Sequence, residues 1–157
     1  MWQKIKTFGI AIAIPLAVGG LSAFITRNSM GIYDKINQPF LAPPSWLFPV
    51  VWTILYILMG VSTGLIYRDK NSSTEDKRKA FVLYGLNLFL NFFWSIIFFN
   101  FGSFFIAFLW LMLMIFVIVK MITAFNKVSP TAAYLQVPYI IWCCFASYLT
   151  ASIWLMN

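Results

Sequence analysis

The spacing of the charged residues constrains this chain more than any other feature. No charged side chain occurs within residues 7–26, 36–67, 80–119 or 128–157. A helix that crosses a bilayer needs about 20 predominantly apolar residues, so each of these segments is long enough to cross. Segment 80–119 would form one helix of about 60 Å, roughly twice the hydrocarbon thickness, and we expect it to fold back on itself. The turn-forming residues in its middle are Asn100, Gly102 and Ser103.

This pattern predicts an all-α integral membrane bundle of five transmembrane helices. We expect one domain over residues 1–157, with spans at roughly 7–26, 46–67, 80–100, 104–125 and 131–155. The composition agrees, because 62% of the residues are hydrophobic and 10% are charged, whereas soluble domains are about half apolar and a quarter charged. The soluble, disordered and disulfide-scaffold classes are therefore excluded. The first span follows Lys4 and Lys6 as a signal peptide would, but its apolar run is long and no cleavage site closes it.

The distribution of Lys and Arg predicts the orientation in the membrane. With five spans, one side carries Lys4, Lys6, Arg68, Lys70, Lys77, Arg78, Lys79, Lys120 and Lys127. The other side carries only Arg27 and Lys35. The positive-inside rule then places the N-terminus in the cytoplasm and the C-terminus outside, as in a multi-pass protein of the cell (plasma) membrane. The net charge of +7 is thus a topology signal; the expected partner is the lipid bilayer, and no nucleic acid is expected.

Few residues suit metal binding or acid–base chemistry. Histidine is absent, and the four acidic residues, Asp34, Asp69, Glu75 and Asp76, all fall in the expected loops. Proton-coupled carriers place ionisable groups inside the bundle, so such a carrier is disfavoured. Cys143 and Cys144 are adjacent, which matches neither a redox CxxC motif nor a zinc pattern. We expect no metal site.

Polar and aromatic residues recur at helical spacing in three of the spans. They are Asn87, Asn91, Trp94, Ser95 and Phe98 in one span, Trp52 and Tyr56 in another, and Tyr134, Pro138, Trp142 and Ala146 in the last. One interpretation is that these side chains join the helices, since amides and indoles bond across membrane helices. The other is a flat pocket in which aromatic faces stack on a planar ligand. The long apolar loop 27–45 is expected to lie over the bundle as a cap.

Three motifs in order resemble a known family. The first is Tyr33-Asp34, Pro39, Pro43-Pro44-Ser45-Trp46, Phe48 and Trp52; the second is Asn87, Asn91, Trp94-Ser95 and Phe98-Phe99; the third is Pro138-Tyr139, Trp142 and Phe145-Ala146-Ser147-Tyr148-Leu149. Together they resemble the tryptophan-rich sensory protein family, also called the translocator protein (TSPO) or peripheral benzodiazepine receptor family. The resemblance covers nearly the whole chain.

The resemblance implies a ligand and a site. Family members bind porphyrins such as protoporphyrin IX, and also benzodiazepine-type or isoquinoline carboxamide drugs, in a cavity beneath the loop. This implies a bacterial tetrapyrrole sensor or scavenger that forms a homodimer, with porphyrin as ligand and no required cofactor. The expected ligand-binding residues are Tyr33, Pro44, Trp46, Trp52, Tyr56, Asn87, Asn91, Trp94, Pro138, Trp142 and Ala146, among which Tyr56 and Pro138 come from the helical pattern.

Two alternative functions stay open. The first is a light- and oxygen-dependent porphyrin-degrading enzyme, in which Trp52 and Trp142 match the tryptophans implicated in the chemistry and are the catalytic hypothesis. The second is a passive transporter of porphyrins or lipid metabolites. The chain also departs from the family, since Leu41 and Ile32 stand where tryptophan is common. This departure favours a weaker grip on porphyrin or a preference for another ligand.

Sterol binding and the dimer interface receive little support from the residues. Tyr148 is present, but no Lys or Arg follows it, as the proposed cholesterol motif requires. Gly9, Ala13 and Ala17 form a stripe of small residues that permits close helix approach. The position of a dimer interface does not follow from this stripe alone.

Overall fold

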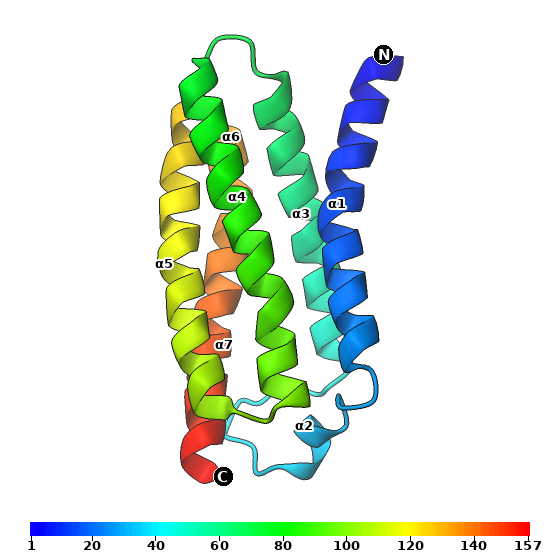
Figure 1. Ribbon diagram of the computed structural model, residues 1–157, viewed down its shortest axis with the longest axis vertical. Helices are drawn as coiled ribbons and strands as arrows, with labels where there is room; N and C mark the ends of the chain where they lie inside the picture. Colours follow the sequence, from blue (N-terminus) through cyan, green and yellow to red (C-terminus); the bar gives the residue numbers. More distant parts are fainter.

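The computed structural model describes residues 1–157, which form helices and connecting loops without any strand (Figure 1). The long helices are α1 (Trp2–Thr26), α3 (Leu47–Arg68), α4 (Thr74–Ser95), α5 (Phe104–Val128) and α7 (Val137–Met156). The short ones are α2 (Ile32–Lys35), α6 (Pro130–Tyr134) and a π-helical turn, η1 (Ile96–Asn100). Five segments are long and apolar enough to cross a membrane: Trp2–Thr26, Leu47–Arg68, Thr74–Asn100, Phe104–Val128 and Pro130–Met156. The expected five-helix membrane bundle is therefore confirmed.

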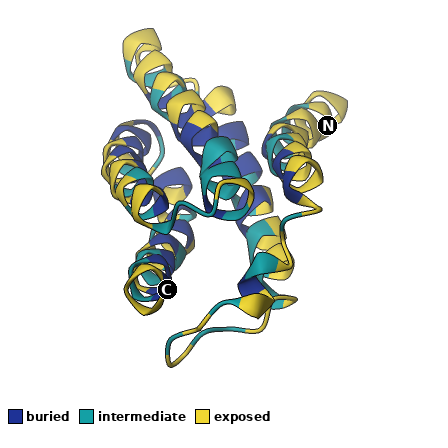
Figure 2. Cartoon of the chain, turned by 60° about the horizontal axis from the view of Figure 1, so that its bottom comes forward, coloured by how far each residue is buried: buried dark blue, intermediate teal, exposed yellow.

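The helices pack side by side with their axes roughly along one direction (Figure 1). The helix α5 packs against α4 and α7, while α1 packs mainly against α3 and also against α4. The two ends of the chain lie at opposite ends of the bundle, and the connection between α3 and α4 lies at the same end as the N-terminus. Figure 2 shows the buried residues turned toward the interior and the exposed ones on the outer faces.

Glycines allow α1 and α3 to approach closely. A Cβ atom at Gly60 would overlap the backbone of Ile12, and one at Gly64 would meet the Phe8 ring. The small-residue stripe expected in the first span does not take part in this contact with α3, because a Cβ at Gly9 would meet nothing within 4 Å. Ala13 and Ala17 are exposed on the same helix. The close approach therefore uses Gly60 and Gly64 of α3 and also Gly19 of α1, where a Cβ would overlap the Tyr56 ring, while the stripe at Gly9, Ala13 and Ala17 faces outward.

Two breaks shape the second half of the chain. Segment 80–119 folds back at Phe101–Ser103, where Gly102 has a φ of 59°, in the left-handed region that favours glycine. The last span, expected as one helix over 131–155, is interrupted, because α6 ends at Tyr134 and α7 begins at Val137. Pro138 lies in the first turn of α7, where the missing amide hydrogen removes no helical bond.

The loop between α1 and α3 folds across the end of the bundle that carries the C-terminus (Figure 1). It is fastened to α7, because the Asn37 amide nitrogen donates to Asn157 Oδ1 at 3.1 Å and Asn157 Nδ2 donates to the Asn37 carbonyl at 3.0 Å. The Tyr148 hydroxyl donates to the Phe40 carbonyl at 2.7 Å. Inside the loop, the Tyr33 hydroxyl donates to the Pro43 carbonyl at 2.7 Å. We call residues 27–46 the cap.

Candidate functional site

A cavity of about 210 Å³ lies beneath the cap, enclosed by α1, α3, α4 and α7. Most of its lining is apolar, and no charged residue takes part in it. Tyr33 of α2 closes it from the cap side and is buried. Burial, with a smaller contribution from the Asp34 carboxylate, raises the pKa of the Tyr33 hydroxyl above its ordinary value of 10.0. Tyr33 therefore stays protonated at neutral pH and remains a donor to the Pro43 carbonyl.

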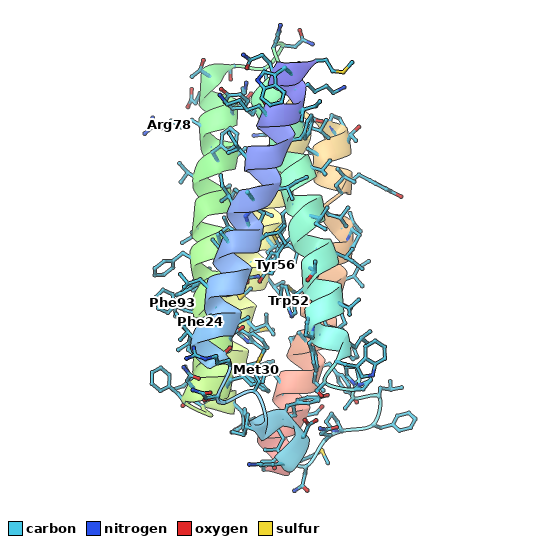
Figure 3. All side chains as sticks on the ribbon, turned by 90° about the vertical axis from the view of Figure 1, so that its right-hand side faces the viewer. Phe24, Met30, Trp52, Tyr56, Arg78 and Phe93 are labelled. Carbon is cyan, nitrogen blue, oxygen red and sulfur yellow. The ribbon has the colours of Figure 1, made fainter.

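Aromatic rings form the walls of this cavity. Trp52 stacks on Tyr56, with ring centroids 5.6 Å apart and 29° between the planes. On the opposite side, Trp94 stacks on Phe98 at 5.2 Å and 26°. Figure 3 shows Trp52 and Tyr56 following one another along α3. Broad flat faces of this kind suit a planar apolar ligand.

The free hydrogen-bond donors next to the cavity are indole groups. The Nε1 atoms of Trp94 and Trp142 are buried and have no hydrogen-bond partner, and both side chains line the cavity. The hydroxyl of Ser22, in contrast, donates to the Phe92 carbonyl at 3.0 Å. A ligand in the cavity that carries an acceptor oxygen would satisfy an indole N–H after a small rotation of the ring. Leaving a buried donor unpaired costs about 1–3 kcal/mol, so such a ligand gains binding energy.

Behind the aromatic wall lies a chain of buried hydrogen bonds. The Tyr56 hydroxyl donates to Asn91 Oδ1 at 2.7 Å, and Asn91 Nδ2 donates to the Tyr139 hydroxyl at 3.0 Å. The Tyr139 hydroxyl in turn donates to Asn87 Oδ1 at 2.6 Å. The asparagines therefore join α3, α4 and α7, as the first interpretation expects, while the aromatic rings line the cavity.

The candidate residues from the sequence fall into three groups. Those that line the cavity are Tyr33, Trp52, Tyr56, Trp94, Trp142 and Ala146. Asn87 and Asn91 lie behind the wall in the hydrogen-bonded chain. Pro44 and Trp46 are exposed and do not line the cavity, and Pro138 lies on an outer groove between α3 and α7.

Sequence reasoning did not identify the residues of α1, or several residues near the predicted ones, that line the cavity. The missed lining residues are Gly19, Ser22, Ala23, Thr26, Met30, Phe48, Pro49, Ser95, Phe98, Phe99, Leu149 and Thr150. Gly19, Ser22 and Thr26 recur at helical spacing, which is the signal that would have placed this face of α1 toward the interior. Ser95 and Phe98 belong to the polar and aromatic face recognised in the sequence, although they were not carried into the candidate site.

Comparisons with known proteins point to one family. The sequence profile of the TspO/MBR family matches residues 11–155. A tryptophan-rich protein TspO from Chlorobaculum tepidum is 36% identical over 158 residues, covering 100% of this chain and 99% of the relative. A protein of the same name from Archaeoglobus fulgidus is 32% identical, covering 94% of each chain. The human translocator protein is 30% identical, covering 99% of this chain and 91% of the relative. This chain belongs to the TspO/MBR family of membrane proteins.

Proposed function

We propose that this membrane protein binds a porphyrin of the protoporphyrin IX type in the cavity beneath the cap, as a tetrapyrrole sensor or scavenger. The observation that carries the proposal is the pairing of flat indole walls with unpartnered indole N–H groups. Trp52 and Trp94 present stacked aromatic faces, and Trp94 and Trp142 hold buried donors without partners. A porphyrin supplies a flat apolar ring for the walls and carboxylate oxygens for the donors. The same chemistry extends to benzodiazepine-type and isoquinoline carboxamide ligands, which carry aromatic rings for the walls and a carbonyl oxygen for the donors.

The size of the cavity sets a condition on this binding. Sites for drug-sized ligands are about 300–1,000 Å³, and the cavity measures about 210 Å³. A whole macrocycle therefore needs the cavity to widen, through movement of the cap or of an aromatic wall. Binding of this kind is slower than diffusion, because it includes a conformational step.

The test is an equilibrium titration with protoporphyrin IX in the dark, comparing Trp94→Phe with the wild type. We expect saturable binding to the wild type and a Kd raised by about 3- to 10-fold in Trp94→Phe, since one hydrogen bond contributes about 0.5–1.5 kcal/mol. Trp154→Phe is the matched control, because Trp154 packs on Phe105 away from the cavity. Absence of saturable binding to the wild type would refute the proposal.

Light-driven breakdown of the bound porphyrin is the second candidate function. Trp52 and Trp142 both line the cavity, so an indole lies next to any ring bound there. One electron passes from the indole to the excited macrocycle, giving an indole radical cation and a porphyrin radical anion, and oxygen is the final oxidant. Replacing both residues with Phe is expected to abolish bleaching under illumination while most of the dark binding remains. Bleaching that survives the double change would remove these tryptophans from the chemistry.

A further inference from the structure

A second apolar hollow lies on the outer face of the bundle between α3 and α7. Its volume is about 970 Å³, and 12 of its 14 lining residues are hydrophobic. Leu47, Val51 and Leu58 line it from α3, and Pro138 and Ile141 line it from α7. The helix α3 packs against α1, α6 and α4 and only slightly against α7. The groove is thus a gap in the wall of the bundle, and it faces the hydrocarbon part of the bilayer because both helices are membrane spans.

Trp142 separates this groove from the cavity. It is the one residue that lines both spaces. Its ring rests on Phe48 at 6.0 Å in an edge-on contact and on Phe145 at 5.5 Å. No hydrogen bond fixes its Nε1 atom. A rotation of this single ring would therefore break packing contacts but no hydrogen bond, and it would join the two spaces; the aromatic contacts are each worth about 0.5–1.5 kcal/mol beyond burial.

The route through the cap is more firmly closed than the route past Trp142. The cap is held to α7 by the paired bonds between Asn37 and Asn157 and by the Tyr148 hydroxyl on the Phe40 carbonyl. An apolar planar molecule partitions into the bilayer, where it meets the groove without crossing water. The cavity is also too small for a drug-sized ligand as it stands, and joining it to the groove removes that limit.

The cap contributes an unusual residue to the outer end of the groove. The Ala42 amide nitrogen donates to the Pro39 carbonyl at 3.2 Å, which closes a turn with Leu41 at its third position. Leu41 has a φ of 74°, a conformation that costs a residue other than glycine roughly 1–2 kcal/mol. In this conformation the Leu41 side chain lines the groove. The turn thereby extends the apolar surface from the helices to the cap.

We propose that the groove between α3 and α7 is the docking site and entrance for a membrane-dissolved planar apolar ligand, which reaches the cavity by displacing the Trp142 ring. This inference rests on the proposed function, since the occupant of the groove is the ligand of the cavity. The groove is a route, so obstructing it slows entry and exit together and leaves the equilibrium affinity unchanged.

The experiment measures association and dissociation rates of protoporphyrin IX in the dark, by stopped-flow porphyrin absorbance, with the full chain in lipid nanodiscs. Ile141→Trp narrows the groove without touching the cavity lining, because Ile141 is exposed and lies only on the groove. Phe116→Trp is the matched control, as Phe116 is 60% exposed on α5 and both variants gain one indole. We expect Ile141→Trp to lower both rates at least fivefold with the Kd within twofold of wild type, and Phe116→Trp to change neither.

A second variant closes the competing route through the cap. Asn37→Cys with Asn157→Cys, in a Cys144→Ala background, joins the cap to α7 after oxidation, and we expect it to leave both rates unchanged. Slow rates in the oxidised cap variant combined with wild-type rates in Ile141→Trp would overturn the lateral entrance. Unchanged rates in both variants would mean that only bilayer lipid occupies the groove, which would overturn the proposal. A raised Kd in Ile141→Trp would mean that the groove is part of the final binding site, which would also overturn it. Absence of saturable binding to the wild type would instead refute the proposed function. The equilibrium titration described above measures that binding separately from the rates.

Discussion

The position of Trp52 depends on hydroxyl groups that belong to its neighbours. Its ring stacks on Tyr56 and meets the edge of Tyr139 at 6.2 Å. Both tyrosines are fixed by hydrogen bonds to Asn91, and Tyr139 is also fixed by Asn87. A membrane interior offers no water to replace these partners, so the bonds define the geometry of the wall. The asparagines thereby position the aromatic surface without lining the cavity themselves.

Replacing Asn91 tests this arrangement at the level of one side chain. Asn91→Leu removes two hydrogen bonds and leaves the Tyr56 hydroxyl without its acceptor. We expect a loss of about 1–3 kcal/mol in the free energy of unfolding, measured by denaturation in mixed detergent micelles. Thr123→Ala is the control, because the Thr123 hydroxyl is exposed and donates only to the Val119 carbonyl of its own helix. Equal stability of Asn91→Leu and the wild type would show that the hydrogen-bonded chain does not hold the helices.

Asp69 provides a prediction about pH in the connection between α3 and α4. Hydrogen bonds from Ser72, with smaller contributions from Asn71 and Lys77, lower the pKa of the Asp69 carboxyl below its ordinary value of 3.8. A lowered pKa in the folded state stabilises this loop above pH 3.8, and the stabilisation is lost as the pH falls through the folded-state value. We expect Ser72→Ala to move the pKa back toward 3.8 in an NMR titration of the carboxyl carbon. Identical titration curves for the two proteins would contradict the role of Ser72.

For single residues, the sequence predicts which side chains line the cavity where aromatic or polar residues repeat at helical spacing. Trp52 and Tyr56 share a face of α3, and Trp142 and Ala146 share a face of α7, so their convergence on the cavity follows from a step of four residues. Trp46 escapes such reasoning, because it lies in a loop whose path is set by contacts with α7. The small residues of α1 that line the cavity, Gly19, Ser22 and Thr26, recur at helical spacing, but their small side chains give a weaker signal than the aromatic and amide groups of the other helices.

Among the helices, α1 is held in the bundle by close packing against α3 more than by hydrophobic burial. Much of its surface is exposed to the membrane, and in lipid the apolar side chains gain nothing by packing on other apolar side chains. Close approach of the backbones supplies the dispersion contacts instead. At Gly60 the backbone of α3 lies so close to Ile12 of α1 that an added Cβ would overlap the Ile12 backbone.

Gly60→Ala tests this contact. The added Cβ overlaps backbone atoms of Ile12, which cannot move aside as a flexible side chain would. We expect a loss of about 1–3 kcal/mol, observed as a lower unfolding temperature in detergent. Gly85→Ala is the control, since a Cβ at Gly85 meets nothing within 4 Å, and it should raise stability by about 0.5–1 kcal/mol. A Gly60→Ala protein as stable as Gly85→Ala would rule out the close contact as the anchor of α1.

The number of membrane helices followed from charge spacing, whereas two details of the elements did not. The fold-back at Gly102 was predictable, because segment 80–119 exceeds the bilayer thickness and contains one turn cluster. The interruption between α6 and α7 was not, because its residues remain apolar and hydropathy does not distinguish a bent span from a straight one. The positive φ of Leu41 was equally hidden, since leucine is an uncommon residue in that conformation.

For the whole molecule, the bundle separates two sets of loops that the charge distribution had already distinguished. The N-terminus and the connection between α3 and α4 lie at one end, and the cap and the C-terminus lie at the other (Figure 1). The end that carries more Lys and Arg is predicted to face the cytoplasm. In that orientation the cavity lies in the outer half of the membrane, beneath the cap.

Cysteine labelling in intact cells tests this orientation. In a Cys144→Ala background, Asn28→Cys in the cap should react with a membrane-impermeant maleimide added outside. Asn71→Cys, between α3 and α4, should react only after the cells are made permeable. Both positions are exposed on the protein, so accessibility depends on the side of the membrane. The reverse pattern would invert the predicted topology.

The cavity beneath the cap is the proposed binding site of the porphyrin. Ala146 lines that cavity and is 6% exposed, so Ala146→Phe places a ring in the space that the ligand requires. The most direct measurement is the Kd for protoporphyrin IX in the dark, compared among the wild type, Ala146→Phe and the control Ala13→Phe on the exposed face of α1. We expect a Kd raised at least tenfold, or by about 1.4 kcal/mol in binding free energy, in Ala146→Phe alone. A Kd in Ala146→Phe within twofold of the wild-type value would place the porphyrin outside this cavity and refute the proposed site.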